Sequence, residues 1–112
     1  MNYKDYVVKR LKSFSKEDVK FSPHAEIRII WRQIDKNEVI ENIINPKRLE
    51  YAVKEEADNN EEKFDCYFGY SKRLCHKYVI VIKENIIVVT VVKINRRWQI
   101  IAERKMKGEQ KC

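Results

Sequence analysis

Residues 22–34 read SPHAEIRIIWRQI, and this stretch decides the fold because it predicts where a helix begins and which side of it is charged. Ser22 is a preferred N-cap, and Pro23 suits the first helical turn because its missing amide hydrogen would have no partner there. On this helix, residues four apart form a basic stripe of His24, Arg28 and Arg32. The apolar residues beside the stripe would bind the helix to a core; they are Ile27, Ile30, Trp31 and Ile34.

The flanking segments predict helices first and strands afterwards. The spacing of apolar residues predicts a helix over residues 3–13, and a short strand is expected over 19–21. A further helix, the next after the one that Ser22 begins, would run from Asp35 to Asn45-Pro46, after which the pattern changes. Asp35 and Glu38 would form a capping-box-like pair at the start of that further helix. Strand patterns follow at residues 49–53, 64–70, 78–83 and 86–94, and residues 98–102 would form one more strand or a short helix.

This order predicts an α+β fold with N-terminal helices packed on one face of a mainly antiparallel sheet of four to five strands. A chain of 112 residues suits one domain, which we expect over residues 1–105, with a helical part at 1–45 and a sheet part at 47–102. Asp58-Asn59-Asn60 and Glu84-Asn85 are the turn signals. The charged tail from Glu103, and above all residues 106–112, would be frayed.

The net charge of +7 indicates a polyanionic partner. The excess is uneven, because residues 50–63 hold six acids and two bases. Three cysteines without a CxxC pair predict reduced thiols in the cytoplasm; they are Cys66, Cys75 and Cys112. We expect no metal site, no cofactor and no membrane span, since metal-ligand spacing, a glycine-rich phosphate loop and a long apolar run are all missing from the sequence.

With these elements assigned, the chain resembles the RelE/ParE-like toxin superfamily. It is most similar to a small prokaryotic family with the pattern H-A-x-x-R-x-x-x-R-x-I, matched here by His24, Ala25, Arg28, Arg32 and Ile34. Glu38-Val39 and Asn45-Pro46 also match the family, and the resemblance covers residues 20–95. The family usually has an Arg-Gly-Ile turn where this chain has Arg32-Gln33-Ile34.

The resemblance implies a compact sheet with helices on one face and cleavage of mRNA, either on the ribosome or free. RNA can be cleaved without a metal, because its own 2′-hydroxyl attacks the neighbouring phosphorus. The protein must then supply a base, an acid and cations around the phosphorane. The candidate catalytic residues are His24 and His76, since histidine alone has an unperturbed pKa in the physiological range, and Arg28, which would stabilise the phosphorane.

Two further basic segments would contact nucleic acid. Residues 71–77, SKRLCHK, link two expected strands and bring Arg73 and Lys77 beside His76. Arg96-Arg97-Trp98 combines an aromatic ring that could stack on a base with two guanidinium groups. The candidate binding residues are therefore Arg32, Arg73, Lys77, Arg96 and Arg97.

Each of these residues also has a structural alternative. His24 would pack on Trp31 or cap a carbonyl, and the two stripe arginines would form a solvated face or pair with nearby acids. Residues 71–77 would be a plain hairpin loop, and Trp98 would belong to the core.

The function we expect is that of a toxin-like, RNA-binding endoribonuclease of the mRNA interferase type, which acts without a metal. An acidic antitoxin would cover its basic face. The alternatives are a non-catalytic nucleic-acid-binding module and a ParE-like toxin that inhibits gyrase.

Overall fold

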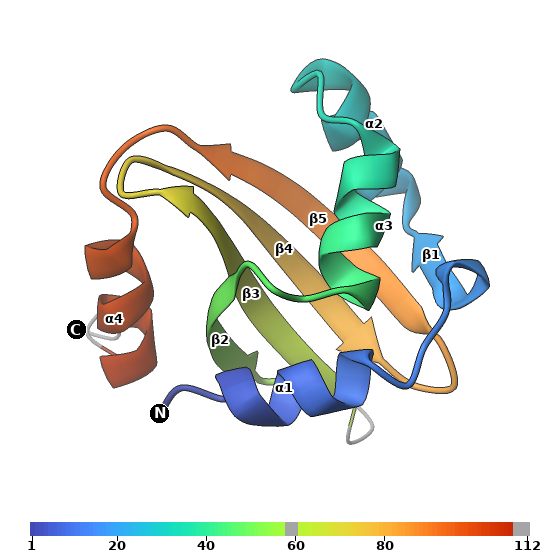
Figure 1. Cartoon of the computed structure of the whole chain (residues 1–112), viewed down its shortest axis with the longest axis horizontal. Helices are drawn as coiled ribbons and strands as arrows, with labels where there is room; N and C mark the ends of the chain where they lie inside the picture. Colours follow the sequence, from blue (N-terminus) through green and yellow to red (C-terminus); the bar gives the residue numbers. More distant parts are fainter. Residues whose placement is uncertain (58–60, 109–112) are drawn as a thin grey trace.

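The computed structural model describes residues 1–57 and 61–108 and shows an α+β fold (Figure 1). The sheet has the strand order β1-β5-β4-β3-β2. The elements, in chain order, are α1 (Lys4–Leu11), a 3-10 turn (Lys16–Asp18), β1 (Val19–Phe21), α2 (Pro23–Trp31), α3 (Lys36–Ile44), β2 (Leu49–Glu55), β3 (Glu62–Ser71), β4 (Leu74–Ile82), β5 (Ile86–Ile94) and α4 (Gln99–Lys107).

The sheet is mixed, which corrects the expectation of a mainly antiparallel sheet. β2, β3, β4 and β5 pair antiparallel in succession, but β1 pairs parallel with β5. The parallel pair arises because β1 reaches its partner through the whole helical segment and three strands, and not through a hairpin.

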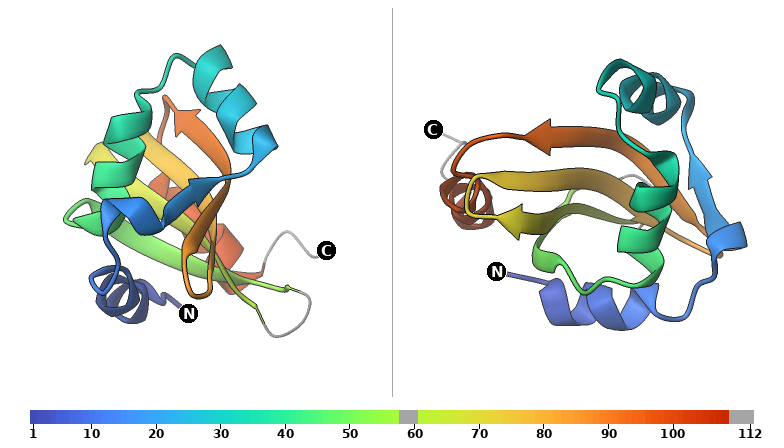
Figure 2. Two further views of the ribbon diagram at one scale, coloured as in Figure 1. Left: turned by 90° about the vertical axis from the view of Figure 1, so that its right-hand side faces the viewer. Right: turned by 45° about the horizontal axis from the view of Figure 1, so that its top comes forward.

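The main core lies between the sheet and the helices α1 and α3, on a side that we call the helical face, and α2 adds Ala25 and Ile29 to it from the edge of the sheet (Figure 2). Val7 and Leu11 of α1 are fully buried, as their helical spacing predicts. From the sheet, alternate residues of β3 point to the same side: Phe64, Cys66 and Phe68. This face is therefore closed by close-packed apolar side chains.

The opposite side of the sheet, which we call the α4 face, is covered by a helix that the sequence indicated only in part. Of the two structures expected for residues 98–102, a strand or a short helix, the helix is correct: α4 begins at Gln99, with Trp98 as its N-cap. It continues through residues 103–107, which corrects the expectation of a frayed tail from Glu103. Trp98, Ala102 and Met106 lie four residues apart and pack on this face. Helices therefore cover both faces of the sheet, while the rest of the expected tail, residues 109–112, lies outside the described residues.

A bulge in β2 distributes its apolar residues over both faces. The pairing with β3 shifts register between Leu49 and Tyr51. Leu49 consequently packs in the main core, whereas Tyr51 and Val53 pack with Trp98 on the α4 face. The alternation over residues 49–53 predicted the strand correctly, but it suggested that all three apolar residues share one face.

The ends of the helices largely follow the expected signals. The Ser22 hydroxyl accepts a hydrogen bond from the Ala25 amide at 3.1 Å, and the Asp35 carboxylate accepts one from the Asn37 amide at 2.9 Å. The carboxylate of Glu38 accepts a hydrogen bond from the Tyr70 hydroxyl, a role that a capping box does not predict. The turn expected at Asp58-Asn59-Asn60 lies outside the described residues.

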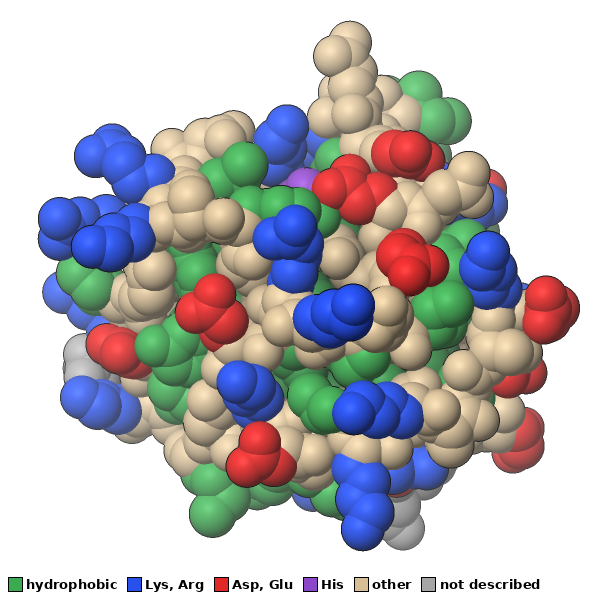
Figure 3. Space-filling view, in the orientation of Figure 1, with side chains coloured by type: hydrophobic (Ala, Val, Ile, Leu, Met, Phe, Trp, Pro, Cys, Tyr) green, Lys and Arg blue, Asp and Glu red, His purple; other side chains and the backbone are tan. Residues whose placement is uncertain are grey.

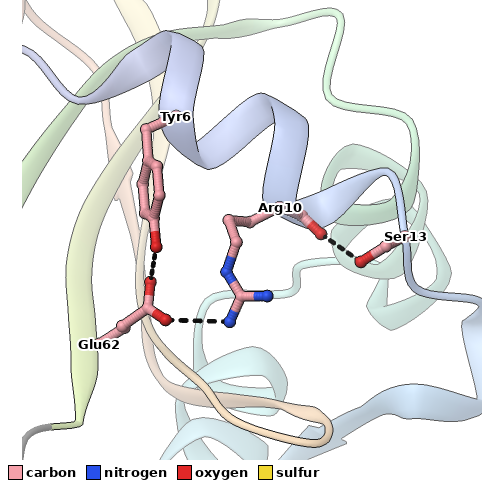
Figure 4. Close-up of polar contacts among 4 residues, drawn as sticks. All are labelled: Tyr6, Arg10, Ser13 and Glu62. Atoms are coloured by element: carbon pink, nitrogen blue, oxygen red, sulfur yellow. Dashed lines mark hydrogen bonds and ion pairs between the residues drawn. The ribbon is translucent and has the colours of Figure 1, made fainter.

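A polar clamp joins α1 to the start of β3 (Figure 4). The Glu62 carboxylate accepts hydrogen bonds from the Tyr6 hydroxyl and, at 3.0 Å, from the Arg10 guanidinium. Burial acts to raise the pKa of Glu62, but the bonds from Tyr6 and Arg10 outweigh it and lower this pKa. The clamp thus favours the charged carboxylate in the folded protein.

We expect Glu62→Gln to lower the free energy of unfolding by about 1 kcal/mol at neutral pH. Because the folded pKa of Glu62 is lowered, this contribution is present above the unfolded pKa and is lost as the pH falls through the folded one. Urea unfolding of both proteins at pH values from neutral to acidic measures the difference. A gap that does not narrow in acid would contradict the prediction, and Tyr6→Phe, which keeps the Arg10 pair, should show a smaller loss.

The turn between α2 and α3 contains a residue in the left-handed region. Gln33 has a φ of 53°, a conformation that is strained for a side chain with a Cβ atom. In the family that the sequence resembles, the residue at this position is usually glycine.

Gln33→Gly should therefore stabilise the protein by roughly 0.5–1 kcal/mol, because glycine adopts this conformation without strain. Thermal unfolding followed by circular dichroism tests this. Gln33→Ala is the matched control, since it shortens the side chain but keeps the Cβ atom, and it should not reproduce the gain.

Candidate functional site

The predicted stripe lies on α2, which runs along the outer edge of β5 past the end of β1. The backbone amide of Ser22 donates to the Val88 carbonyl at 3.0 Å, and its hydroxyl donates to the Val89 carbonyl at 2.9 Å. α2 therefore takes the place beside β5 that a longer β1 would occupy.

His24 is exposed at the N-terminal end of this helix. Its Nε2 atom lies 3.1 Å from the Thr90 hydroxyl of β5 and 3.4 Å from Nε of Arg28. Because a guanidinium N–H can only donate, Nε2 acts as the acceptor in the contact with Arg28. An accessible imidazole thus has its lone pair beside a fixed positive charge.

The two arginines of the stripe have different surroundings. The Arg28 guanidinium lies 5.6 Å from the centroid of the Trp31 ring. The Arg32 guanidinium donates to the Val91 carbonyl of β5 at 2.8 Å, so it satisfies a backbone group at the strand edge. Neither contact is one of the acid pairs that the sequence offered as an alternative.

The outermost line of α2 is apolar, which corrects our expectation that Ile27, Ile30 and Trp31 pack in the core. Their exposed fractions are 48%, 73% and 72%. Ala25 and Ile29 are the buried residues of the helix, on the opposite side, because α2 lies beside the sheet instead of over it. We call Ile27, Ile30 and Trp31 the apolar crest; Ile34 is buried as expected.

Residues 71–77 are mostly strand, which corrects the expectation of a loop and separates the side chains of this segment. Only Lys72 and Arg73 lie between β3 and β4. His76 and Lys77 are consecutive in β4, so they point to opposite faces of the sheet. His76 is 4% exposed on the helical face, and Lys77 lies on the α4 face, where its Nζ is 3.6 Å from the Asp65 carboxylate.

His76 belongs to a polar network between the sheet and α3. The amide nitrogen of Asn42 donates to the Tyr70 and Tyr78 hydroxyls at 2.8 and 2.9 Å. The Tyr70 hydroxyl donates to Glu38 at 2.6 Å, and the Tyr78 hydroxyl lies 2.8 Å from Nδ1 of His76. Since Tyr78 already accepts from Asn42, its own hydrogen is available to His76, whose Nδ1 then accepts as a neutral imidazole does.

The network was missed in the sequence, although it left a signal there. Asn42 lies on the apolar side of its helix, between Val39 and Ile43, where a buried amide needs partners. His76 and Tyr78 are two residues apart and therefore on one face of β4. Neither pattern says which buried groups meet.

Several basic side chains follow the outer edge of β5 toward one end of the sheet. Arg28 contacts His24, which lies beside Thr90, and Arg32 donates to the Val91 carbonyl. Lys93 is exposed near the end of the strand, and Arg96 and Arg97 follow the strand after one residue. The β3–β4 turn with Arg73 is adjacent, since the Trp98 indole donates to the Ser71 carbonyl at 2.8 Å. We call these six residues, Arg28, Arg32, Arg73, Lys93, Arg96 and Arg97, the basic edge.

Figure 3 shows Lys and Arg side chains gathered over this end of the molecule, where the β3–β4 turn and the β5–α4 connection lie. Elsewhere on the same side of the molecule they alternate with acidic side chains.

Trp98 itself is fully buried, so its role is in the core and not in base stacking. A separate expectation concerns the membrane: among residues 1–57 and 61–108, none of the helices has the length and apolar character that a bilayer span requires.

The environment of His76 predicts a loss of stability in mild acid. Burial lowers the pKa of His76; Lys93 and Arg48 act in the same direction, and Glu38 opposes them. A lowered folded pKa means that stability is complete above the unfolded pKa and declines as the pH falls below it. We expect the free energy of unfolding to decline as the pH falls below the ordinary histidine pKa of about 6.5 and the decline to end once the pH is below the lowered folded pKa.

Urea unfolding at several pH values measures this decline. His76→Gln keeps an acceptor for Tyr78 but cannot take up a proton, so its decline over the same range should be smaller. Equal declines in the two proteins would show that His76 is not the source.

Comparison with known proteins adds no relative to this description. No family model matches the chain, and neither the search of curated proteins nor that of solved structures gave a match.

Proposed function

We propose that this protein is a RelE/ParE-like toxin that binds single-stranded RNA along the basic edge and cleaves it without a metal ion. The observation that carries the proposal is the position of His24, an exposed imidazole whose Nε2 lies 3.4 Å from Arg28. A base for the 2′-hydroxyl and a cation for the phosphorane are thereby adjacent.

The basic edge has the features of a surface that follows an extended strand. From Thr90 to Ile94 alone it extends for roughly 13 Å, at about 3.3 Å per residue. Proteins that bind single strands combine such a line of cations with an exposed aromatic ring on which bases stack. Trp31, with the Arg28 guanidinium over its ring, supplies that platform at the His24 end.

The histidines differ in what they can do. His76 is buried and faces the network of Asn42 and Tyr78, so we assign it a structural role and give the acid–base role to His24. The leaving 5′-oxygen would be stabilised by Arg28. Lys77, on the α4 face, is separate from this surface and is left out of the RNA site.

The proposal includes the partner and the compartment. An acidic antitoxin would cover the basic edge and contact the apolar crest, since the crest lies directly beside the arginines of α2. The protein would act in the cytoplasm, where free thiols persist; Cys66 and Cys75 are both buried, on opposite faces of the sheet.

A labelled single-stranded RNA, incubated with the purified protein in EDTA with and without ribosomes, tests both parts of the proposal. We expect His24→Ala to reduce cleavage by at least about 100-fold while binding persists. Cleavage by His24→Ala at the wild-type rate would remove His24 from the mechanism. Binding without any scission would instead favour the non-catalytic nucleic-acid-binding module.

Binding itself is tested by its dependence on salt. Arg28→Gln should reduce the slope of log affinity against log salt by about 0.7, the value for one phosphate contact on a single strand. Trp31→Ala should weaken binding at least about fivefold through lost stacking. Lys12→Gln, an exposed change at the end of α1, is the matched control and should change neither quantity beyond its effect on net charge.

The apolar crest favours a second candidate, a toxin that inhibits gyrase through a protein contact. Exposed isoleucine and tryptophan side chains in one patch are more typical of protein interfaces than of RNA surfaces. Inhibition of DNA supercoiling that is lost in Ile30→Ala, with RNA left intact, would favour this candidate over the first.

A further inference from the structure

A second polar site lies on the α4 face, away from the basic edge. A cleft of about 880 Å³ opens between the sheet, α4 and the N-terminal residues. Its apolar walls come from Tyr3, Val53, Ile101 and Met106. A volume of this size is typical of sites for small organic molecules, which combine apolar walls with a few convergent polar groups.

The Tyr67 side chain lines this cleft, and its hydroxyl has no hydrogen-bond partner among the described residues, although the residue is fully buried. The ring is held in place, because it stacks on Trp98 with centroids 6.3 Å apart and an interplanar angle of 8°. Buried hydroxyl groups in native proteins nearly always have partners. An unpartnered hydroxyl at the wall of a cleft therefore indicates that a ligand supplies the missing hydrogen bond.

Lysines give the cleft its charge. Four lysines line it, Lys54, Lys77, Lys105 and Lys107, against two glutamates, Glu55 and Glu56. The Asp65 carboxylate beneath the cleft offsets part of this excess through Lys77 and Lys105. Burial, and then the hydrogen bond with Glu55, raises the pKa of Asp65, although both lysines act in the opposite direction. The surface of the cleft therefore favours a negative group.

Lys77 is the neighbour of Tyr67 across the two strands. Tyr67 and Lys77 are directly paired across β3 and β4, and the Lys77 ammonium lies 5.8 Å from the Tyr67 ring centroid. At 3.6 Å from Asp65, this ammonium forms an ion pair too long for a good hydrogen bond and keeps its donors for another acceptor.

We propose that this cleft binds a small organic anion, whose charged group lies between Lys77 and the Tyr67 hydroxyl and whose apolar body contacts Val53, Ile101 and Met106. The proposal does not depend on RNA binding or cleavage at the basic edge.

Anilinonaphthalene sulfonate is a suitable probe, because it joins a sulfonate to an apolar body and fluoresces when it leaves water. We expect it to bind the native protein at one site and to shift backbone amide resonances of β3, β4 and α4. Neutral N-phenylnaphthylamine has the same body without the sulfonate and should bind more weakly.

Two variants and two controls locate the site. Tyr67→Phe should weaken sulfonate binding about fivefold, and it should leave the melting temperature unchanged or raised because the lost hydroxyl has no partner in the protein. Lys77→Met should weaken binding about tenfold, whereas Lys77→Arg should retain it. Trp31→Ala, on the apolar crest, is the control for binding of the probe at the other exposed apolar surface. It should leave the affinity for the sulfonate unchanged.

The proposal is overturned if the sulfonate does not bind the native protein, or if Tyr67→Phe leaves the affinity unchanged. It is also overturned if Trp31→Ala abolishes binding, or if the neutral probe binds as tightly as the sulfonate and is equally sensitive to Lys77→Met. Should Lys77→Met fail to fold, Tyr67→Phe and the neutral probe still decide the outcome.

Discussion

The outer edge of β5 needs partners for its backbone carbonyls, and the arrangement of the helices depends on how these are supplied. β1 has only three residues and covers only the first part of this edge. Beyond it, Ser22 and Arg32 donate to the Val89 and Val91 carbonyls, which replaces a strand by side chains of a helix. α2 must therefore lie beside the sheet. Its basic stripe then faces the strand edge, and its apolar crest faces solvent.

Most of the elements could be predicted from the sequence, since periodicity and caps are local. The exceptions are the first residues of β4, which the sequence placed in a loop, and the second half of α4, which it placed in a frayed tail. α1, α2 and α3 have the predicted positions, and Ser22, Asp35 and Pro46 mark their ends as expected. Partners across the sheet could not be predicted. The bulge after Leu49 depends on register, and the burial of His76 depends on which face of the sheet a helix covers. The spacing of His76 and Tyr78 places both on one face of β4, but it does not say what covers that face. The same holds for the apolar crest, because helical spacing identifies an apolar stripe without saying whether anything covers it.

The two faces of the sheet differ in whether their buried polar groups have hydrogen-bond partners. On the helical face, Asn42 joins Glu38, Tyr70, Tyr78 and His76 in a chain of hydrogen bonds, which fixes α3 on the strands. On the α4 face, the aromatic pair of Tyr67 and Trp98 borders the cleft, and the Tyr67 hydroxyl has no hydrogen-bond partner among the described residues. One side of the sheet is therefore closed by packed and hydrogen-bonded side chains, whereas the other side borders a cleft.

The bond from Arg32 to Val91 has a consequence for the amount of folded protein in a cell. Beyond Val89, where the Ser22 hydroxyl is bonded, the Arg32 side chain covers the Val91 carbonyl of this edge. This part of the edge is open to pairing with a strand of another molecule whenever that side chain leaves it. A substitution at Arg32 would then act through misassembly and removal by proteases, which lowers the amount of protein present. Selection on this arginine would thus reflect abundance as well as whatever the basic edge binds, so the persistence of the residue is not by itself evidence of a role in function.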